Sequence, residues 1–158
     1  VAEKGERWTG SLLFNIASSL SYANNVFSGN GISLQDEIYF IQNKIIKDLA
    51  EKGSCVIVGR CADYALSEYK DCFSVFVHAD TDWRINRLSQ KHNKTAKEAK
   101  DMINKTDKSR SSYYNYYTNK KWGSADSYNL CLDSSKLGID GTAKAIIEAI
   151  HIYDSLKK

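Results

Sequence analysis

Short apolar runs that alternate with longer stretches of helical periodicity are the feature that most constrains the fold of this chain. The runs lie at residues 55–58, 73–78 and 128–132, and the first two are rich in β-branched or aromatic residues. Largely apolar strands are typical of sheets covered on both faces, and parallel strands need a long crossover, usually a helix, between them. The alternation therefore predicts an α/β fold, with one parallel sheet and helices packed on both of its faces.

The segments around these runs carry signals for helix starts and stops. A first helix is expected to continue through Glu51 and end at Gly53, and a later one to continue towards Tyr117. The stretch 11–26 is apolar-rich and is expected to be helical, whereas residues 1–10 are expected to be a poorly ordered end. Side chains that can accept a hydrogen bond from the first helical turn stand at each expected start. These expected N-caps are Ser33, Asp80, Thr95 and Asp140.

Length and composition indicate one ordinary globular domain over residues 1–158. The chain is 42% hydrophobic and 26% charged, and its formal net charge of +3 is too small to indicate a nucleic-acid binder. No run of about 18 apolar residues occurs, and the first residues are too polar for a signal peptide. We therefore expect a cytoplasmic protein with no membrane partner. Oligomeric state has no signature in the sequence.

The cysteines and histidines do not have the spacing of a metal site. None of the four cysteines forms a Cys-x-x-Cys pair, and the three histidines stand apart from one another. Reduced, buried thiols are the preferred interpretation, with disulfides or zinc as the alternatives. The cysteines are Cys55, Cys61, Cys72 and Cys131.

A glycine and an arginine follow the first apolar run directly. In open parallel sheets, ligands bind beyond the carboxyl ends of the strands. Gly59 would let a ligand approach the backbone, and the planar guanidinium of Arg60 suits a phosphate group. The alternative is a turn glycine beside a surface arginine.

Two further groups of charged residues follow the second run. Arg84 and Arg87 are three residues apart, so they share a helix face and can reach one anion. Asp107 precedes Arg110 by three residues in a lysine-rich segment, where it can orient that arginine or accept a sugar hydroxyl. Each group alone is compatible with a solvated surface. Together they provide the positive charge that phosphoryl transfer requires.

The ordered succession of these motifs resembles the cytidylate-kinase-like family of P-loop kinases, over about residues 25–155. The resemblance implies the three-layer fold of a P-loop nucleoside monophosphate kinase, with a lid-like region at about residues 91–122. The motifs that carry it are Gly-Ser-Cys-Val-Ile-Val-Gly-Arg-Cys-Ala-Asp-Tyr (53–64), His78-Ala-Asp80, Arg84, Arg87, Lys-Thr-Asp-Lys-Ser-Arg (105–110), Tyr-Tyr-Asn-Tyr-Tyr (113–117), Trp122-Gly123, Leu-Cys-Leu-Asp-Ser-Ser (130–135) and Leu-Gly-Ile-Asp-Gly (137–141).

The resemblance also implies roles for these residues. Gly59 and Arg60 would grip the acceptor nucleotide, and Asp107 and Arg110 would face its sugar and phosphate. By the same resemblance, the lid-base residues Arg84 and Arg87 would act at the transferred phosphate. Asp133 and Ser134 would lie near the base of the donor. The implied donor and cofactor are ATP and Mg²⁺, and no protein metal site is expected.

A glycine-rich phosphate loop is missing from the sequence. No Gly-x-x-x-x-Gly-Lys-Ser/Thr occurs, and such a loop supplies backbone amides, a lysine and a Mg²⁺-binding hydroxyl. In the fold that the resemblance implies, the first β-strand leads into this loop and lies between the runs 55–58 and 73–78. Loss of that strand leaves two strand edges with unpaired backbone hydrogen-bonding groups. We therefore expect an absent βα unit of about 30–40 residues upstream of Val1. The alternative is a protein that never had the unit.

Three functions remain open at this point. The leading hypothesis is a nucleoside monophosphate kinase that transfers the γ-phosphoryl group of ATP, with CMP as the first acceptor to test. The second is a catalytically inactive nucleotide-binding module. The third is a basic RNA-binding or interaction protein that uses the lysines of 91–108 and the nearby tyrosines, although nucleic acid is not an expected partner of the leading hypothesis.

Overall fold

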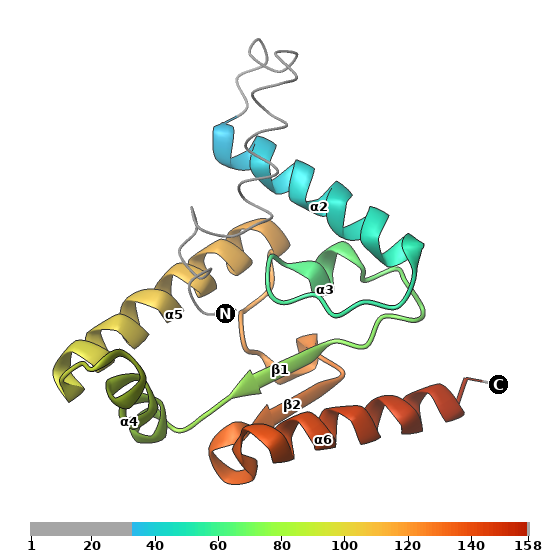
Figure 1. Cartoon of the computed structure of the whole chain (residues 1–158). Coiled ribbons are helices and arrows are strands. Elements are labelled where there is room, and N and C mark those ends of the chain that lie inside the picture. The colour runs from blue at the N-terminus through green and yellow to red at the C-terminus, as the bar shows by residue number, and fades with distance from the viewer. Residues whose placement is uncertain (1–32, 158) are drawn as a thin grey trace. The chain divides into compact units, whose positions relative to one another are not determined.

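The computed structural model describes residues 33–157, which form an α/β chain of mostly helical elements (Figure 1). It divides into two compact units, the first ending at Tyr69 and the second beginning at Lys70. The stretches 1–10 and 11–26, for which a disordered end and a helix were expected, lie outside the described residues. Among the helices of residues 33–157, none combines the length and the apolar character needed to cross a bilayer.

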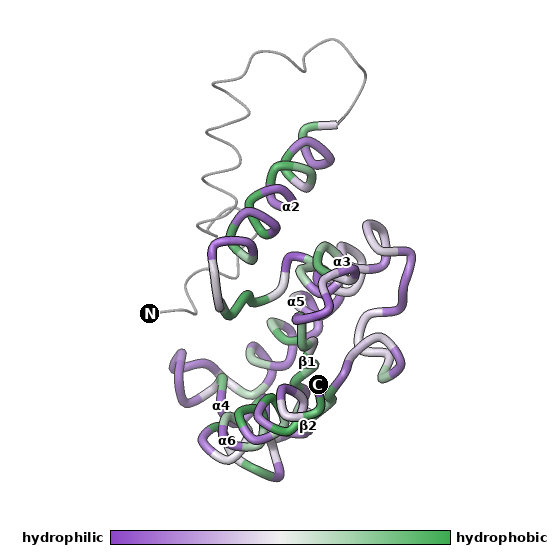
Figure 2. Tube along the Cα trace, turned by 90° about the vertical axis from the view of Figure 1, so that its right-hand side faces the viewer, coloured by the Kyte–Doolittle hydropathy of each residue, from purple (hydrophilic) through white to green (hydrophobic). Residues whose placement is uncertain are grey.

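The first unit contains α2 (Leu34–Lys52) and the short helix α3 (Ala62–Ala65). Ser33 caps α2 by accepting a hydrogen bond from the backbone N–H of Asp36 (3.2 Å), and Gly53 ends the helix. Both boundaries confirm the sequence prediction. Apolar and polar residues alternate along α2 (Figure 2), and one stripe of the helix is buried. The buried residues are Ile38, Tyr39, Gln42 and Ile46.

Residues 55–58 do not form a strand, so this sequence prediction was wrong. The segment is irregular, and the side chains of Val56 and Val58 are 94% and 84% exposed. β-branched side chains favour an extended backbone locally, but a strand also needs a neighbour for its N–H and C=O groups. No ladder partner for this segment exists in the part of the chain that the structure describes.

The second unit contains two parallel strands, β1 (Val75–His78) and β2 (Leu130–Asp133). Val75 pairs with Leu130 and His78 with Asp133, so the strands are in register over their full length. Just before the ladder, the amide oxygen of Asn129 accepts hydrogen bonds from the backbone N–H and the hydroxyl of Ser74, both at 2.8 Å. The predicted parallel pairing of these two runs is confirmed, and each strand is shorter than predicted.

Two helices that follow β1 pack against each other. They are α4 (Thr81–His92) and α5 (Ala96–Thr118), and their shared core contains Ile85, Ala99 and Ile103, with Leu88 against it. The carboxylate of Asp80 caps α4, and the reciprocal Thr95–Glu98 capping box begins α5. These caps confirm the sequence prediction, because a cap depends on residues two or three positions apart.

The last helix, α6 (Ser134–Ser155), begins directly after β2 and runs along the sheet (Figure 1). Its N-cap is Asp133, and the predicted cap at Asp140 was wrong. Gly138, with φ +66° and ψ 178°, interrupts the helical backbone after one turn. The helical backbone resumes after Gly138, so Asp140 lies within the first turn of the continuing helix rather than before its start.

Aromatic rings cover part of the sheet beside the chain that leads into β2. The ring of Phe76 lies 5.4 Å from that of Trp122 and 5.0 Å from that of Tyr128, measured between centroids. This chain turns at Gly123 (φ +74°) and continues through the 3₁₀ helix η3 (Ala125–Ser127). A Cβ atom at Gly123 would lie 3.1 Å from the ring of Phe76.

We expect Gly123→Ala to destabilise the second unit by about 2 kcal/mol. A left-handed backbone costs a non-glycine residue about 1 kcal/mol, and crowding against a packed ring adds a similar amount. A Phe76→Leu background is the control, because the ring that the added Cβ would meet is absent from it and only the backbone cost should remain. Urea unfolding measures the loss in both backgrounds. Equal losses with and without the Phe76 ring would contradict the contact.

Candidate functional site

The carboxyl ends of β1 and β2 lie side by side because His78 is paired with Asp133. Helix α4 begins three residues after His78, and α6 begins immediately after Asp133. The hydroxyl of Ser134 donates a hydrogen bond to the backbone carbonyl oxygen of His78 (3.0 Å), which links the two strand ends. Polar residues following both strands are thus collected at one edge of the sheet.

The carboxylate of Asp133 is held by the residue two positions later. Its Oδ1 accepts hydrogen bonds from the hydroxyl and the backbone N–H of Ser135, at 2.5 and 2.9 Å. The hydroxyl hydrogen bond is the main reason why the pKa of Asp133 lies below its ordinary value. Asp133 and Ser134, the residues expected near a donor base, therefore shape the turn between β2 and α6.

A charged cluster joins α4 to α5. The guanidinium of Arg84 makes a two-point ion pair with Asp107: Nη1 donates to Oδ2 at 2.7 Å and Nη2 to Oδ1 at 2.8 Å. Arg110 Nη1 lies 3.8 Å from the same Oδ1. We call Arg84, Asp107 and Arg110 the arginine cluster. Its formal charge is +1, and its side chains are partly exposed.

Sequence reasoning identified the members of this cluster but not how they pair. It placed Asp107 beside Arg110, one helical turn away, whereas the shorter contacts of Asp107 are to Arg84, 23 residues earlier. It also expected Arg84 and Arg87 to act together on one anion. The guanidinium carbon of Arg87 lies 5.6 Å from the ring centroid of Trp83, a cation–π distance, and joint action of the two arginines on one anion stays a prediction.

Gly59 and Arg60 lie in a left-handed turn of the first unit. Gly59, Arg60 and Cys61 have successive φ values of +70°, +58° and +54°, which is uncommon for the two non-glycine residues. Cys61 is buried, and this burial raises the pKa of its thiol to about 12. Arg60 therefore stands on a strained backbone next to a buried cysteine.

None of the four cysteines forms a disulfide, but only Cys61 is buried. Cys72 and Cys131 are partly exposed. Cys55 is exposed because its segment is not part of a sheet, so its predicted burial was wrong.

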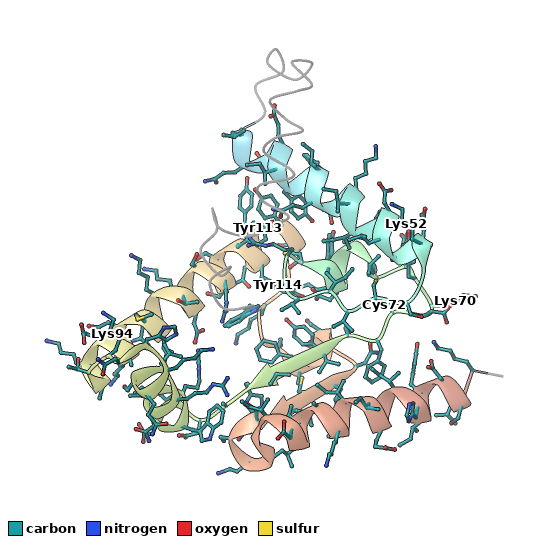
Figure 3. All side chains as sticks on the ribbon, viewed as in Figure 1. Lys52, Lys70, Cys72, Lys94, Tyr113 and Tyr114 are labelled. Carbon is teal, nitrogen blue, oxygen red and sulfur yellow. The ribbon has the colours of Figure 1, made fainter. Side chains whose placement is uncertain are left out.

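The lysine-rich region forms an exposed surface of α4 and α5. Figure 3 shows Lys94 at the end of the α4–α5 pair, and its ammonium lies 3.7 Å from the carboxylate of Glu98. Of the tyrosines late in α5, Tyr114 is buried and its ring stacks near that of Tyr128, whereas Tyr116 is 73% exposed. Packing thus accounts for Tyr114.

A metal ion bound by protein side chains alone finds no set of ligands among the described residues. Within residues 33–157, no group of three or more His, Cys, Asp or Glu side chains is arranged to hold a metal ion. Mg²⁺ in nucleotide enzymes is held largely by substrate phosphates and one or two protein ligands. A Mg²⁺ ion bound with a nucleotide would therefore be held mainly by the phosphates of that nucleotide.

One comparison with known proteins identifies a family. The model of the cytidylate kinase-like family matches residues 2–136. Among solved structures, that of an uncharacterized protein from Eubacterium ventriosum ATCC 27560 is similar, with 29% sequence identity, a TM-score of 0.71 and coverage of 93% of each chain. No curated protein matches the chain.

We expect Ser135→Ala to raise the pKa of Asp133 towards its ordinary value, because the substitution removes the largest cause of the lowering. An NMR titration of the side-chain carboxyl carbon measures this change. The stabilisation associated with the lowered pKa is present above the pKa of the unfolded chain and is lost as the pH falls through that of the folded protein. The variant should therefore lose less stability on acidification.

Ser134→Ala is the matched control for this titration. Its hydroxyl bonds to His78 rather than to Asp133, so the pKa of Asp133 should stay where it is in the unsubstituted protein. A shift in this control equal to that in Ser135→Ala would refute the assignment.

Proposed function

Because the chain belongs to the cytidylate kinase-like family, we propose that it acts as an ATP-dependent nucleoside monophosphate kinase, with CMP as the first acceptor to test. The observation that carries the proposal is the arginine cluster on the two helices that follow β1. It combines two guanidinium groups, net positive charge and partial exposure. Guanidinium groups bind phosphate through paired N–H donors, which fixes orientation as well as charge.

Phosphoryl transfer needs little covalent chemistry from the protein and depends on positioning and charge neutralisation. In the proposed reaction, Arg84 and Arg110 bind phosphate oxygens of the donor and of the acceptor. The phosphoryl group moves between these two phosphates. Arg87 contributes further positive charge from the same helix as Arg84. A guanidinium does not lose its proton at neutral pH, so these side chains stabilise negative charge without acting as acids or bases.

Acceptor binding is proposed for Gly59 and Arg60, and donor-base binding for Asp133 and Ser134. The strained turn supports the first assignment, because strained backbone is concentrated at functional sites. The position of Asp133 and Ser134 after β2 supports the second, because open parallel sheets bind ligands at that edge. Both assignments also depend on the family resemblance.

The phosphates of the donor ATP need a glycine-rich phosphate loop to bind them, and residues 1–158 contain no such motif. No Gly-x-x-x-x-Gly-Lys-Ser/Thr occurs in the sequence. The test therefore uses the protein expressed from its complete reading frame. Its substrates are ATP with CMP, UMP or AMP, in the presence of Mg²⁺.

We expect Arg110→Lys to lower the catalytic efficiency of this protein about 100-fold, which corresponds to ~2.7 kcal/mol of transition-state stabilisation. Lysine keeps the charge but replaces a two-point phosphate contact by a single ammonium. If the contact strengthens during transfer, kcat should fall as well as substrate affinity. Coupled-assay kinetics with each acceptor measure both parameters.

Lys108→Gln is the control, because it removes an exposed cation from the same helix. It should change the efficiency less than Arg110→Lys does. Identical kinetics of Arg110→Lys and the unsubstituted protein with all three acceptors would remove Arg110 from the site. If the folded unsubstituted protein binds nucleotide without transferring phosphate, the inactive-module hypothesis would replace the kinase.

A further inference from the structure

Asp107 contacts Arg84 in a way that leaves part of the guanidinium available. An arginine has five N–H donors, two on each Nη and one on Nε. Asp107 takes one hydrogen bond from Nη1 and one from Nη2, which is an end-on arrangement. Three donors therefore remain, and they include the Nε–H edge. Among the described residues, the side chain of Arg84 has no other hydrogen-bond partner, and it is 29% exposed.

The same carboxylate also lies between two cations. Arg110 Nη1 is 3.8 Å from Oδ1, the oxygen that accepts from Arg84 Nη2. Two guanidinium groups that approach one point repel each other, and a carboxylate between them offsets this repulsion. Asp107 thus fixes the direction of Arg84 and allows Arg110 to stay near it.

We propose that Asp107 is a positioning residue that holds Arg84 end-on, so that the Nε–H edge of Arg84 is presented to a phosphate group of the substrate. The proposal rests on the proposed function for the identity of that substrate, but its geometry concerns any phosphate. It gives Asp107 a role other than the sugar contact that the family resemblance implies. In this role, the carboxylate of Asp107 strengthens the binding of an anion although it is itself negatively charged.

The direction in which substitution of Asp107 changes the affinity for an anion separates this role from simple electrostatics. Replacing an aspartate by asparagine removes one negative charge, so charge alone predicts tighter binding of an anion. Loss of positioning predicts weaker binding, because an asparagine NH₂ group cannot accept from a guanidinium and Arg84 regains its rotamer freedom. The same sign separates positioning from a carboxylate that blocks the phosphate site, because removal of a block would also tighten binding.

The experiment compares Asp107→Asn with Asp101→Asn, which removes the same charge from an exposed position on the same helix. Binding of inorganic phosphate and of CMP to the full-length protein is measured by calorimetry or NMR titration. We expect Asp107→Asn to weaken binding of both probes about tenfold. Asp101→Asn should leave binding unchanged or tighten it slightly. Tighter binding by Asp107→Asn would overturn the proposal.

A double-mutant cycle tests whether Asp107 acts through Arg84. In an Arg84→Gln background, Asp107→Asn should have no further weakening effect on phosphate binding, because the group that it positions is absent. An undiminished tenfold loss in that background would overturn the proposal. Asp107→Glu provides a second variant if the asparagine protein does not fold. It keeps the charge but moves it by one methylene, so binding should weaken, and unchanged binding would contradict the positioning role.

The binding readout also separates this proposal from the proposed function. Phosphate binding that follows the expected order, in a protein without kinase activity, would support the positioning role and reject the kinase. Kinase activity combined with unchanged phosphate and CMP binding in Asp107→Asn would support the kinase and reject the positioning role.

Discussion

The parallel ladder between β1 and β2 determines where most of the candidate site can form. Pairing of His78 with Asp133 brings two chain segments, more than 50 residues apart, to one edge of the sheet. Helices α4 and α6 both begin at that edge, each capped by an aspartate. The polar groups of the strand ends are therefore collected by backbone hydrogen bonds rather than by contacts among the side chains themselves.

The arginine cluster adds a second, electrostatic connection to this arrangement. Apolar contacts of Ile85, Ala99 and Ile103 pack α4 against α5, but they do not orient polar groups. The two-point pair of Arg84 with Asp107 does so, because a planar guanidinium and a carboxylate meet in a fixed geometry. A partly exposed ion pair contributes little to stability, typically about 0–1 kcal/mol. Its geometry is therefore better explained by the placement of charge than by the stability of the helices.

The features that sequence reasoning predicted correctly depend on neighbouring residues or on strong apolar patterning. The caps Ser33, Asp80 and Thr95 are examples, since each cap is decided within three residues. The prediction of a strand at 55–58 was wrong because a strand also needs a partner elsewhere in the chain. The pairing of Asp107 with Arg84 could not be predicted because its partners lie 23 residues apart on different helices. Sequence motifs identified the residues of the cluster, and the packing of the helices decided their contacts.

The central claim, that the arginine cluster binds substrate phosphate, is tested most directly by the NMR signal of the Arg84 Nε–H group during titration with CMP. The account predicts a large chemical-shift change of this signal that saturates with nucleotide, while the exposed lysines of α5 show only small changes. An Arg84 Nε–H signal that stays unchanged in the saturated protein would contradict the claim.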